Sequence, residues 1–181
     1  TKVVGECAIT YDIHQISMMG DTSLVGQKQI FIKGNSCKTI LKTPAFTQTL
    51  IFNTQQDTAI ILKEIGLNKI LQYISYASMQ PVNLVASKKN GTTNTLLDYP
   101  CETITLSWAD GNSMEVTYTN LIIPTVTVYE QAFKEIPGLV MRYQLTSKEG
   151  NKILYNANKI DLSPITLNVF EVNKSNYQQI N

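Results

Sequence analysis

Residues 7–14 read CAITYDIH, and this stretch shows the pattern that governs most of the chain. Its apolar side chains occupy every second position, with mostly polar side chains between them: Cys7, Ile9, Tyr11 and Ile13 alternate with Ala8, Thr10, Asp12 and His14. Successive side chains of a β-strand point to opposite faces of the sheet. The two-residue period therefore predicts a strand with one buried face.

The same alternation recurs along the rest of the chain. Further sets of alternating apolar residues are Ile30 and Ile32; Phe46, Leu50 and Phe52; Ile104, Leu106 and Trp108; Met114, Val116 and Tyr118; Leu139, Met141, Tyr143 and Leu145; and Ile153, Tyr155 and Ala157. Thr, Gln, Glu, Lys or Asn oppose each set on most alternate positions. One buried and one wet face is typical of an antiparallel sheet.

Turn residues separate these strands at short intervals. Gly34-Asn35, Asp110-Gly111-Asn112 and Glu149-Gly150-Asn151 each lie between two alternating segments, which predicts hairpins. Gly66-Leu67-Asn68 lies between two continuously apolar segments. We favour a further hairpin there, although continuous apolar flanks also permit a helix.

Two stretches are candidates for helices. One runs from Tyr76 to Ser87 and is broken by Pro81, and the other runs from Thr125 to Lys134. A sheet of about ten strands needs cover for its apolar face, and either helix could lie across it. No repeat, low-complexity tract or linker divides the chain, so we expect a single domain over residues 1–181.

The composition argues against several classes of function. The 181 residues carry 15 basic and 14 acidic side chains, and this near-neutral balance disfavours binding to nucleic acid. Arg142 is the only arginine and His14 the only histidine. Because these side chains most often grip phosphate, bind metal or move protons, we expect a non-enzymatic protein with no catalytic residues, cofactor or metal.

Known catalytic motifs give the same result. The chain contains no GxSxG, HExxH, GxGxxG or GxxxxGK[ST] motif. His14 falls on the polar side of its strand, where a surface histidine is the simpler interpretation. Cys7, Cys37 and Cys101 lack metal-binding or redox spacing, so buried thiols are favoured, and a disulfide between two of them is the alternative.

Export from the cytoplasm is a further expectation. No segment approaches the length of a membrane-spanning apolar run, so we expect no transmembrane segment. The first residue, Thr1, is not a start methionine, which indicates trimming and is consistent with a removed signal sequence.

The order of the segments resembles that of a family of small envelope proteins related to the periplasmic lipoprotein carriers of Gram-negative bacteria, the LolA/LolB-like proteins. The resemblance covers about residues 28 to 180. Its most specific parts are Tyr99-x-Cys101, Ile136-Pro137-Gly138-Leu139 and the closing Phe170-x-Val172 with Tyr177. Asp98, Val140 and Asn173 depart from residues that are common in that family.

This resemblance implies a mainly β, α+β fold. The implied structure is a curved antiparallel sheet of about ten to eleven strands, an incomplete barrel whose concave face is covered by a few helices. It also implies an apolar cavity between sheet and helices, and a periplasmic or outer-membrane-associated location. If the cavity is present, six inward-facing side chains are candidates to line it: Phe52, Leu106, Trp108, Met114, Met141 and Tyr143.

Two functions fit these expectations. The first is binding or carriage of a hydrophobic ligand, a lipid or a lipoprotein acyl chain, in the cavity. The second is an envelope interaction module with a fully packed interior and a protein partner. That partner would bind an exposed apolar loop, either Met18-Met19-Gly20-Asp21 or Leu121-Ile122-Ile123-Pro124. Peripheral membrane association and self-association stay open.

Overall fold

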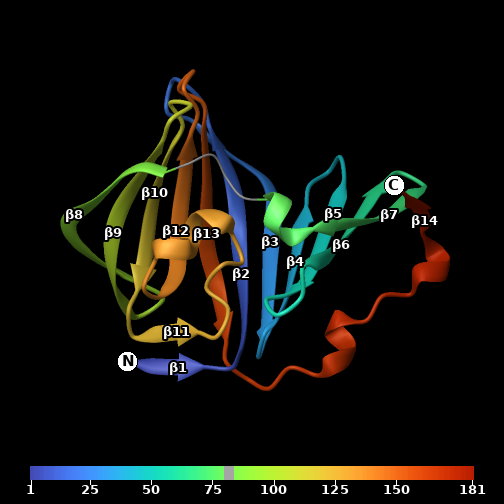
Figure 1. Cartoon of the computed structure of the whole chain (residues 1–181). Helices are drawn as coiled ribbons and strands as arrows, with labels where there is room; N and C mark the ends of the chain where they lie inside the picture. The colour runs from blue at the N-terminus through green and yellow to red at the C-terminus, as the bar shows by residue number, and fades with distance from the viewer. Residues whose placement is uncertain (80–83) are drawn as a thin grey trace.

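The computed structural model of the chain describes residues 1–79 and 84–181, and these residues are almost entirely β (Figure 1). They form 14 strands: β1 (Lys2–Val4), β2 (Glu6–Ile16), β3 (Thr22–Lys33), β4 (Ser36–Lys42), β5 (Thr47–Asn53), β6 (Thr58–Ile65), β7 (Asn68–Ser75), β8 (Leu84–Leu96), β9 (Tyr99–Trp108), β10 (Ser113–Thr119), β11 (Ile122–Pro124), β12 (Leu139–Thr146), β13 (Lys152–Asp161) and β14 (Gln178–Ile180). Four short 3₁₀ turns complete the regular structure: η1 (Tyr76–Met79), η2 (Gln131–Glu135), η3 (Leu167–Phe170) and η4 (Lys174–Asn176).

Twelve of the strands form one open, curved sheet. Their order is β14-β7-β6-β5-β4-β3-β2-β13-β12-β10-β9-β8, and every neighbouring pair is antiparallel except β14 with β7. The remaining two strands, β1 and β11, form a small parallel sheet. In Figure 1 the large sheet is strongly curved, with β8 at one edge and β14 at the other.

The chain builds this sheet from two runs of neighbouring strands. Strands β2 to β7 follow one another as consecutive hairpins. The chain then reaches the opposite edge at β8 and returns through β9, β10, β12 and β13, so that β13 pairs with β2. Segments from both ends of the sequence therefore meet in the middle of the sheet.

The predicted hairpins are confirmed. Gly34 and Gly66 adopt φ angles of 58° and 59° in the turns of β3–β4 and β6–β7, a region that glycine occupies without steric cost. The strand interpretation of the residues around Gly66 is correct, because β6 and β7 pair directly from Thr58–Ser75 to Ile65–Asn68. Turns also join β9 to β10 and β12 to β13 at the predicted positions.

The alternation in the sequence corresponds to the two faces of the sheet. All four apolar residues quoted from β2 are buried, and the polar residues between them are partly exposed. Tyr11, Ile30 and Ile32 are completely buried on the concave face. Burial of these side chains is the main contribution to the stability of the core.

The expected α+β fold with helices over the concave face is wrong. Strands make up 62% of the structure and helical turns 9%, and no α-helix occurs in residues 1–79 or 84–181. The stretch from Thr125 to Lys134 begins with the β-branched run TVTV after Pro124, and it has no regular structure before the short turn η2. β-Branched side chains disfavour helix, and this preference opposes the expected helix.

The other expected helix is also largely absent. Its first residues form only the single turn η1, and from Leu84 the chain is the edge strand β8. Residues 80–83, which include Pro81, lie outside the described residues. Every described position of β8 up to Thr95 is exposed, so no apolar pattern in the sequence marks this strand.

A non-helical segment covers the concave face instead. Residues 120–138, which we call the covering segment, join β10 to β12 and run across the concave face of the sheet (Figure 1). The segment is fixed at one end by the β1–β11 pairing and by a 2.6 Å hydrogen bond from Thr125 Oγ1 to the Gly34 carbonyl. Phe133 in η2 is completely buried and anchors the other end.

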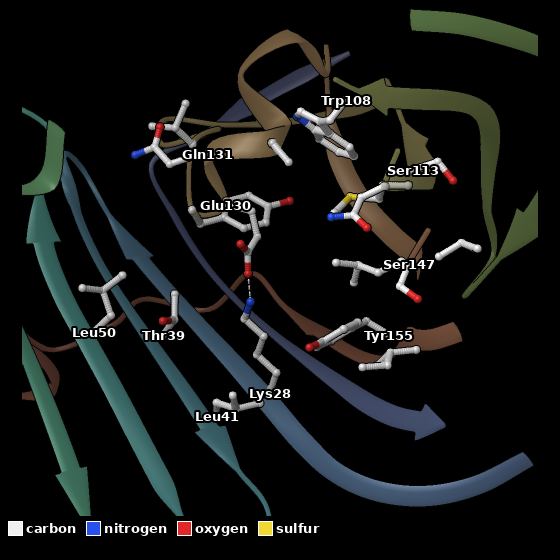
Figure 2. A pocket seen from close by; sticks show the side chains of 18 of the residues that line it. Lys28, Thr39, Leu41, Leu50, Trp108, Ser113, Glu130, Gln131, Ser147 and Tyr155 are labelled. Carbon is white, nitrogen blue, oxygen red and sulfur yellow. Dashed lines mark ion pairs between the residues drawn. The ribbon is translucent and has the colours of Figure 1, made fainter. Parts of the chain in front are cut away.

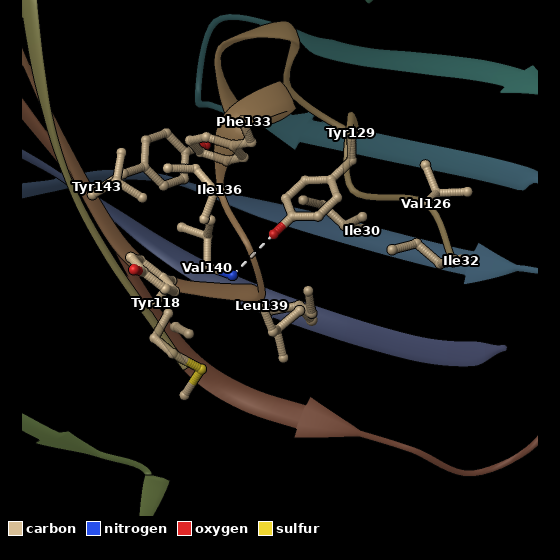
Figure 3. Packing of buried hydrophobic residues seen from close by; sticks show 14 of the residues in the cluster. Ile30, Ile32, Tyr118, Val126, Tyr129, Phe133, Ile136, Leu139, Val140 and Tyr143 are labelled. Atoms are coloured by element: carbon tan, nitrogen blue, oxygen red, sulfur yellow. Dashed lines mark hydrogen bonds between the residues drawn. The ribbon is translucent and has the colours of Figure 1, made fainter. Parts of the chain in front are cut away.

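Aromatic packing holds the covering segment against the sheet (Figure 3). The Phe133 ring meets the ring of Tyr143 edge-to-face, with centroids 5.0 Å apart. The Tyr129 hydroxyl accepts a 3.1 Å hydrogen bond from the Val140 amide of β12. Edge-to-face pairs add a preferred geometry to hydrophobic burial, so these contacts hold the covering segment in one position on the sheet.

Candidate functional site

A pocket of about 640 Å³ lies between the concave face of the sheet and the covering segment (Figure 2). Strands β3, β4 and β5 supply one wall, and the β9–β10 and β12–β13 hairpins supply the opposite wall. Residues 128–132 of the covering segment and Tyr76 of η1 complete it. Such a volume falls within the range of roughly 300–1,000 Å³ that is usual for small-molecule sites.

Much of the pocket wall is apolar. The apolar and aromatic side chains that line it are Leu41, Leu50, Tyr76, Trp108, Met114, Val128, Ala132, Leu145, Ile153 and Tyr155. Figure 2 shows Leu50 and Trp108 on opposite sides of the space. A wall of this kind stabilises a ligand mainly by removing its apolar surface from water.

One ion pair lies inside this apolar surrounding. The Lys28 ammonium of β3 is paired with the carboxylate of Glu130 from the covering segment (Figure 2). The two side chains differ in accessibility: 10% of the Lys28 side chain and 34% of the Glu130 side chain are exposed. The cation is therefore held deep in the wall, and its partner lies closer to solvent.

Aromatic groups complete the surroundings of the Lys28 ammonium. Lys28 Nζ donates a 3.2 Å hydrogen bond to the Tyr143 hydroxyl and lies 5.5 Å from the centre of the Tyr155 ring. The Tyr143 and Tyr155 rings stack at 4.3 Å, nearly parallel. Burial lowers the pKa of Lys28 to about 8, and the negative charge of Glu130 favours the ammonium form.

Polar side chains line other parts of the pocket. Asp110 and Asn112 lie in the β9–β10 turn, where both oxygens of Asp110 accept hydrogen bonds from Asn112. Asp110 therefore has a structural role in its turn. Gln131 differs, because its Nε2 atom is buried and has no hydrogen-bond partner among the described residues. A buried donor without a partner carries a free-energy cost.

The six predicted cavity residues divide between this pocket and the core. Trp108 and Met114 line the pocket. Phe52, Leu106, Met141 and Tyr143 do not line it and are buried in the core. Two of these four contact residues that line the pocket. The Phe52 ring stacks on the Tyr76 ring at 4.3 Å, and the Tyr143 hydroxyl accepts the hydrogen bond from Lys28.

The sequence analysis did not identify the ion pair, although the position of Lys28 in its strand gave a signal for one of the two partners. Lys28 lies two and four positions before Ile30 and Ile32, so it shares their inward face. A lysine at an inward position of an alternating strand is unusual and marks a buried charge. No comparable signal identifies Glu130, because its place depends on the path of the covering segment.

The two loops considered as protein contacts have different environments. Met18 and Met19 at the β2–β3 turn are 88% and 91% exposed. Leu121 to Pro124 is mostly strand β11, in which Ile122 is only 3% exposed. The first loop is therefore the more exposed of the two, although Leu121 of the second is 40% exposed.

The three cysteines are free and buried. This finding supports the thiol interpretation over a disulfide. Burial raises the pKa of Cys7 to about 12 and the pKa of Cys37 well above its ordinary value. Neither thiol is therefore an activated nucleophile at neutral pH.

The described residues lack two other kinds of feature. Within residues 1–79 and 84–181, no three His, Cys, Asp or Glu side chains gather in a way that could hold a metal ion. The same part of the chain contains no helix with the length and apolarity needed to cross a membrane.

Comparisons with known proteins inform the fold alone. No family model and no curated protein matches the chain. Among solved structures, PNGF-II matches 98% of this chain with a TM-score of 0.58 and 13% sequence identity. The chain spans only 31% of the length of the PNGF-II chain. This likeness supports the β architecture, and the resemblance to lipoprotein carriers stays a prediction from the sequence.

Proposed function

We propose that this protein binds a hydrophobic small molecule or an acyl chain, without catalysis, in the pocket beneath the covering segment. The observation that carries the proposal is the pocket itself, about 640 Å³ in volume, with aliphatic and aromatic side chains along much of its wall. The interaction-module alternative needs no such pocket, so the pocket supports ligand binding over that alternative. A location in the cell envelope stays a prediction from the resemblance.

The charge balance of the pocket narrows the class of ligand. The Lys28 ammonium already has a counter-charge in Glu130. An anionic ligand would therefore bring a second carboxylate beside one cation, and either it or Glu130 would lose its partner in a poorly solvated place. A neutral ligand leaves the ion pair intact, so we expect neutral apolar molecules to bind more tightly than the corresponding acids.

A pair of tryptophan variants tests the proposal. Leu50→Trp places a large ring in the pocket, and Leu67→Trp makes the same change in the β6–β7 turn, where Leu67 is fully exposed. Decan-1-ol, at about 100 times its Kd, is expected to raise the Tm of the wild type and of Leu67→Trp by roughly 5 °C. Leu50→Trp is expected to lose this shift, with unchanged circular dichroism as the check of folding.

Two results would contradict the proposal. One is the absence of a Tm shift in the wild type with both decan-1-ol and decanoic acid. The other is an equal shift in Leu50→Trp and Leu67→Trp, which would place the binding outside the pocket. A larger shift with decanoic acid than with decan-1-ol would leave ligand binding standing but contradict the preference for neutral ligands.

A further inference from the structure

We propose that Lys28 forms a reversible imine with hydrophobic aldehydes or ketones that enter the pocket, so that the protein takes neutral carbonyl compounds as covalent ligands. This inference rests on the proposed function, because the carbonyl compound must first enter the pocket. It goes beyond that function by naming the reactive group of the ligand and the residue that bonds to it.

The geometry places a single amine where a carbonyl group would come to rest. Lys28 lines the pocket from β3, together with Thr39 and Leu41 of the neighbouring strand (Figure 2). An apolar chain lying along Leu50 and Trp108 would bring its polar end toward this amine. The low exposure of Lys28 keeps bulk water away from the bond that would form.

The surroundings of Lys28 suit an iminium ion as well as they suit an ammonium ion. Both carry one positive charge on the same nitrogen, and Glu130 supplies the counter-charge in either case. The face of the Tyr155 ring, 5.5 Å from the nitrogen, attracts a cation of either kind. The reaction therefore changes no net charge inside the pocket.

The proton balance can be met by the ion pair itself. Glu130 takes a proton from the Lys28 ammonium, and the free amine attacks the carbonyl carbon, which forms a C–N bond and breaks the C=O π bond. One N–H proton then moves from the nitrogen to the alkoxide oxygen and gives a hydroxyl group. Glu130 then returns its proton to that hydroxyl, which leaves as water, and the iminium remains beside the carboxylate. One ammonium and one carbonyl compound thus give one iminium and one water molecule. Burial favours the free amine of Lys28, because it lowers the pKa of this side chain below the ordinary lysine value.

Reductive trapping tests this reaction on the whole protein. Decanal and sodium cyanoborohydride at pH 7 should convert the iminium into a stable secondary amine, with the mass gain of one decyl group. Peptide mass mapping should locate the decyl group on Lys28, at a rate about tenfold above that of exposed lysines such as Lys88. Decan-1-ol in excess should suppress the labelling of Lys28 and leave that of Lys88 unchanged.

Two variants serve as a matched pair. Lys28→Arg keeps a positive charge but cannot form an imine, and it should lose the fast-labelled site. Lys88→Arg makes the same change on the exposed strand β8, and this variant should keep the fast labelling of Lys28. Labelling spread over surface lysines, with Lys28 modified no faster than Lys88 in the wild type, would overturn the proposal even if Lys28→Arg fails to fold.

The outcomes also separate this proposal from the proposed function. If decan-1-ol shifts the Tm of the wild type but decanal does not label Lys28 preferentially, the pocket binds apolar ligands and the imine is excluded. If decan-1-ol and decanoic acid give no Tm shift and Lys28 is not labelled, both proposals fail.

Discussion

Lys28 and Glu130 form an ion pair that joins strand β3 to the covering segment, and only the glutamate is substantially accessible to solvent. The two partners therefore respond differently when the other is removed. An unpaired charge is costly when it is buried and is nearly neutral in stability when water can reach it. This asymmetry gives the first prediction.

Glu130→Ala is expected to destabilise the protein by about 1–3 kcal/mol, because it leaves the Lys28 ammonium buried without a counter-charge. Lys28→Met is expected to cost less, since its methionine packs in the apolar wall and Glu130 can turn toward water. Urea unfolding at pH 7 measures both values. A larger loss for Lys28→Met than for Glu130→Ala would contradict this account of the pair.

The pH dependence of Glu130→Ala provides a separate check. The pKa of Lys28 is lowered in the folded state. The buried ammonium therefore destabilises the folded state fully below about pH 8, and this destabilisation decreases as the pH rises toward the ordinary pKa of lysine. The stability difference between wild type and Glu130→Ala should therefore narrow between about pH 7 and 10. A difference that stays constant over this range would show that Lys28 is not the group responsible.

The buried thiols predict a loss of stability in alkali. The pKa of Cys37 is raised by burial, so above about pH 9 the unfolded chain releases a proton that the folded chain retains. Each such thiol should lower the free energy of unfolding by about 1.4 kcal/mol per pH unit. In reducing buffer, Cys37→Ala should be less stable at pH 7 but lose stability less steeply above pH 9.

The neighbouring variant Ser36→Ala serves as the control, because it removes no thiol. Its slope above pH 9 should equal that of the wild type. If Cys37→Ala and the wild type lose stability at the same rate, ionisation of Cys37 has no part in alkaline unfolding.

Gly138 is expected to tolerate no side chain. A Cβ at this position would lie 2.1 Å from the Thr119 carbonyl oxygen, which belongs to the backbone of β10. Gly138→Ala must therefore displace the junction of the covering segment with β12, at a cost of about 2–4 kcal/mol. Gly5→Ala is the matched control, because a Cβ there meets no atom within 4 Å. Equal stabilities of the two variants in chemical unfolding would refute the close approach.

Phe133 links the stability of the core to the shape of the pocket. Its completely buried ring packs on Tyr129 and Tyr143, and the adjacent Ala132 and Gln131 line the pocket. Phe133→Ala should cost about 3–5 kcal/mol and should also weaken decan-1-ol binding. Calorimetric titration of the folded variant measures the second effect, and an unchanged Kd would show that the anchor does not position the pocket wall.

The sheet was largely predictable from the sequence, since burial on one face imposes a two-residue period. That period identified β2, β3, β5, β9, β10, β12 and β13, and the turn residues located the β3–β4, β6–β7, β9–β10 and β12–β13 hairpins. The cover was not predictable in the same way. Residues 125–128 are β-branched and form no helix, and the exposed edge strand β8 has no apolar period at all.

The pocket was predictable only in part, for a related reason. Alternation identifies which residues face inward, and it therefore pointed to Trp108 and Met114 together with Leu106 and Met141. Whether an inward side chain meets a neighbour or an open space depends on where the covering segment crosses the sheet. That path is set by contacts between residues far apart in sequence, such as Thr125 with Gly34.

The most direct measurement of the central claim is native mass spectrometry of the protein purified without detergent. Binding of a hydrophobic ligand in the pocket predicts that the wild type and Leu67→Trp carry an additional mass of lipid size, and that Leu50→Trp carries none. Ligand-free wild-type protein that also gains no mass on addition of decan-1-ol, decanal or decanoic acid would contradict the claim.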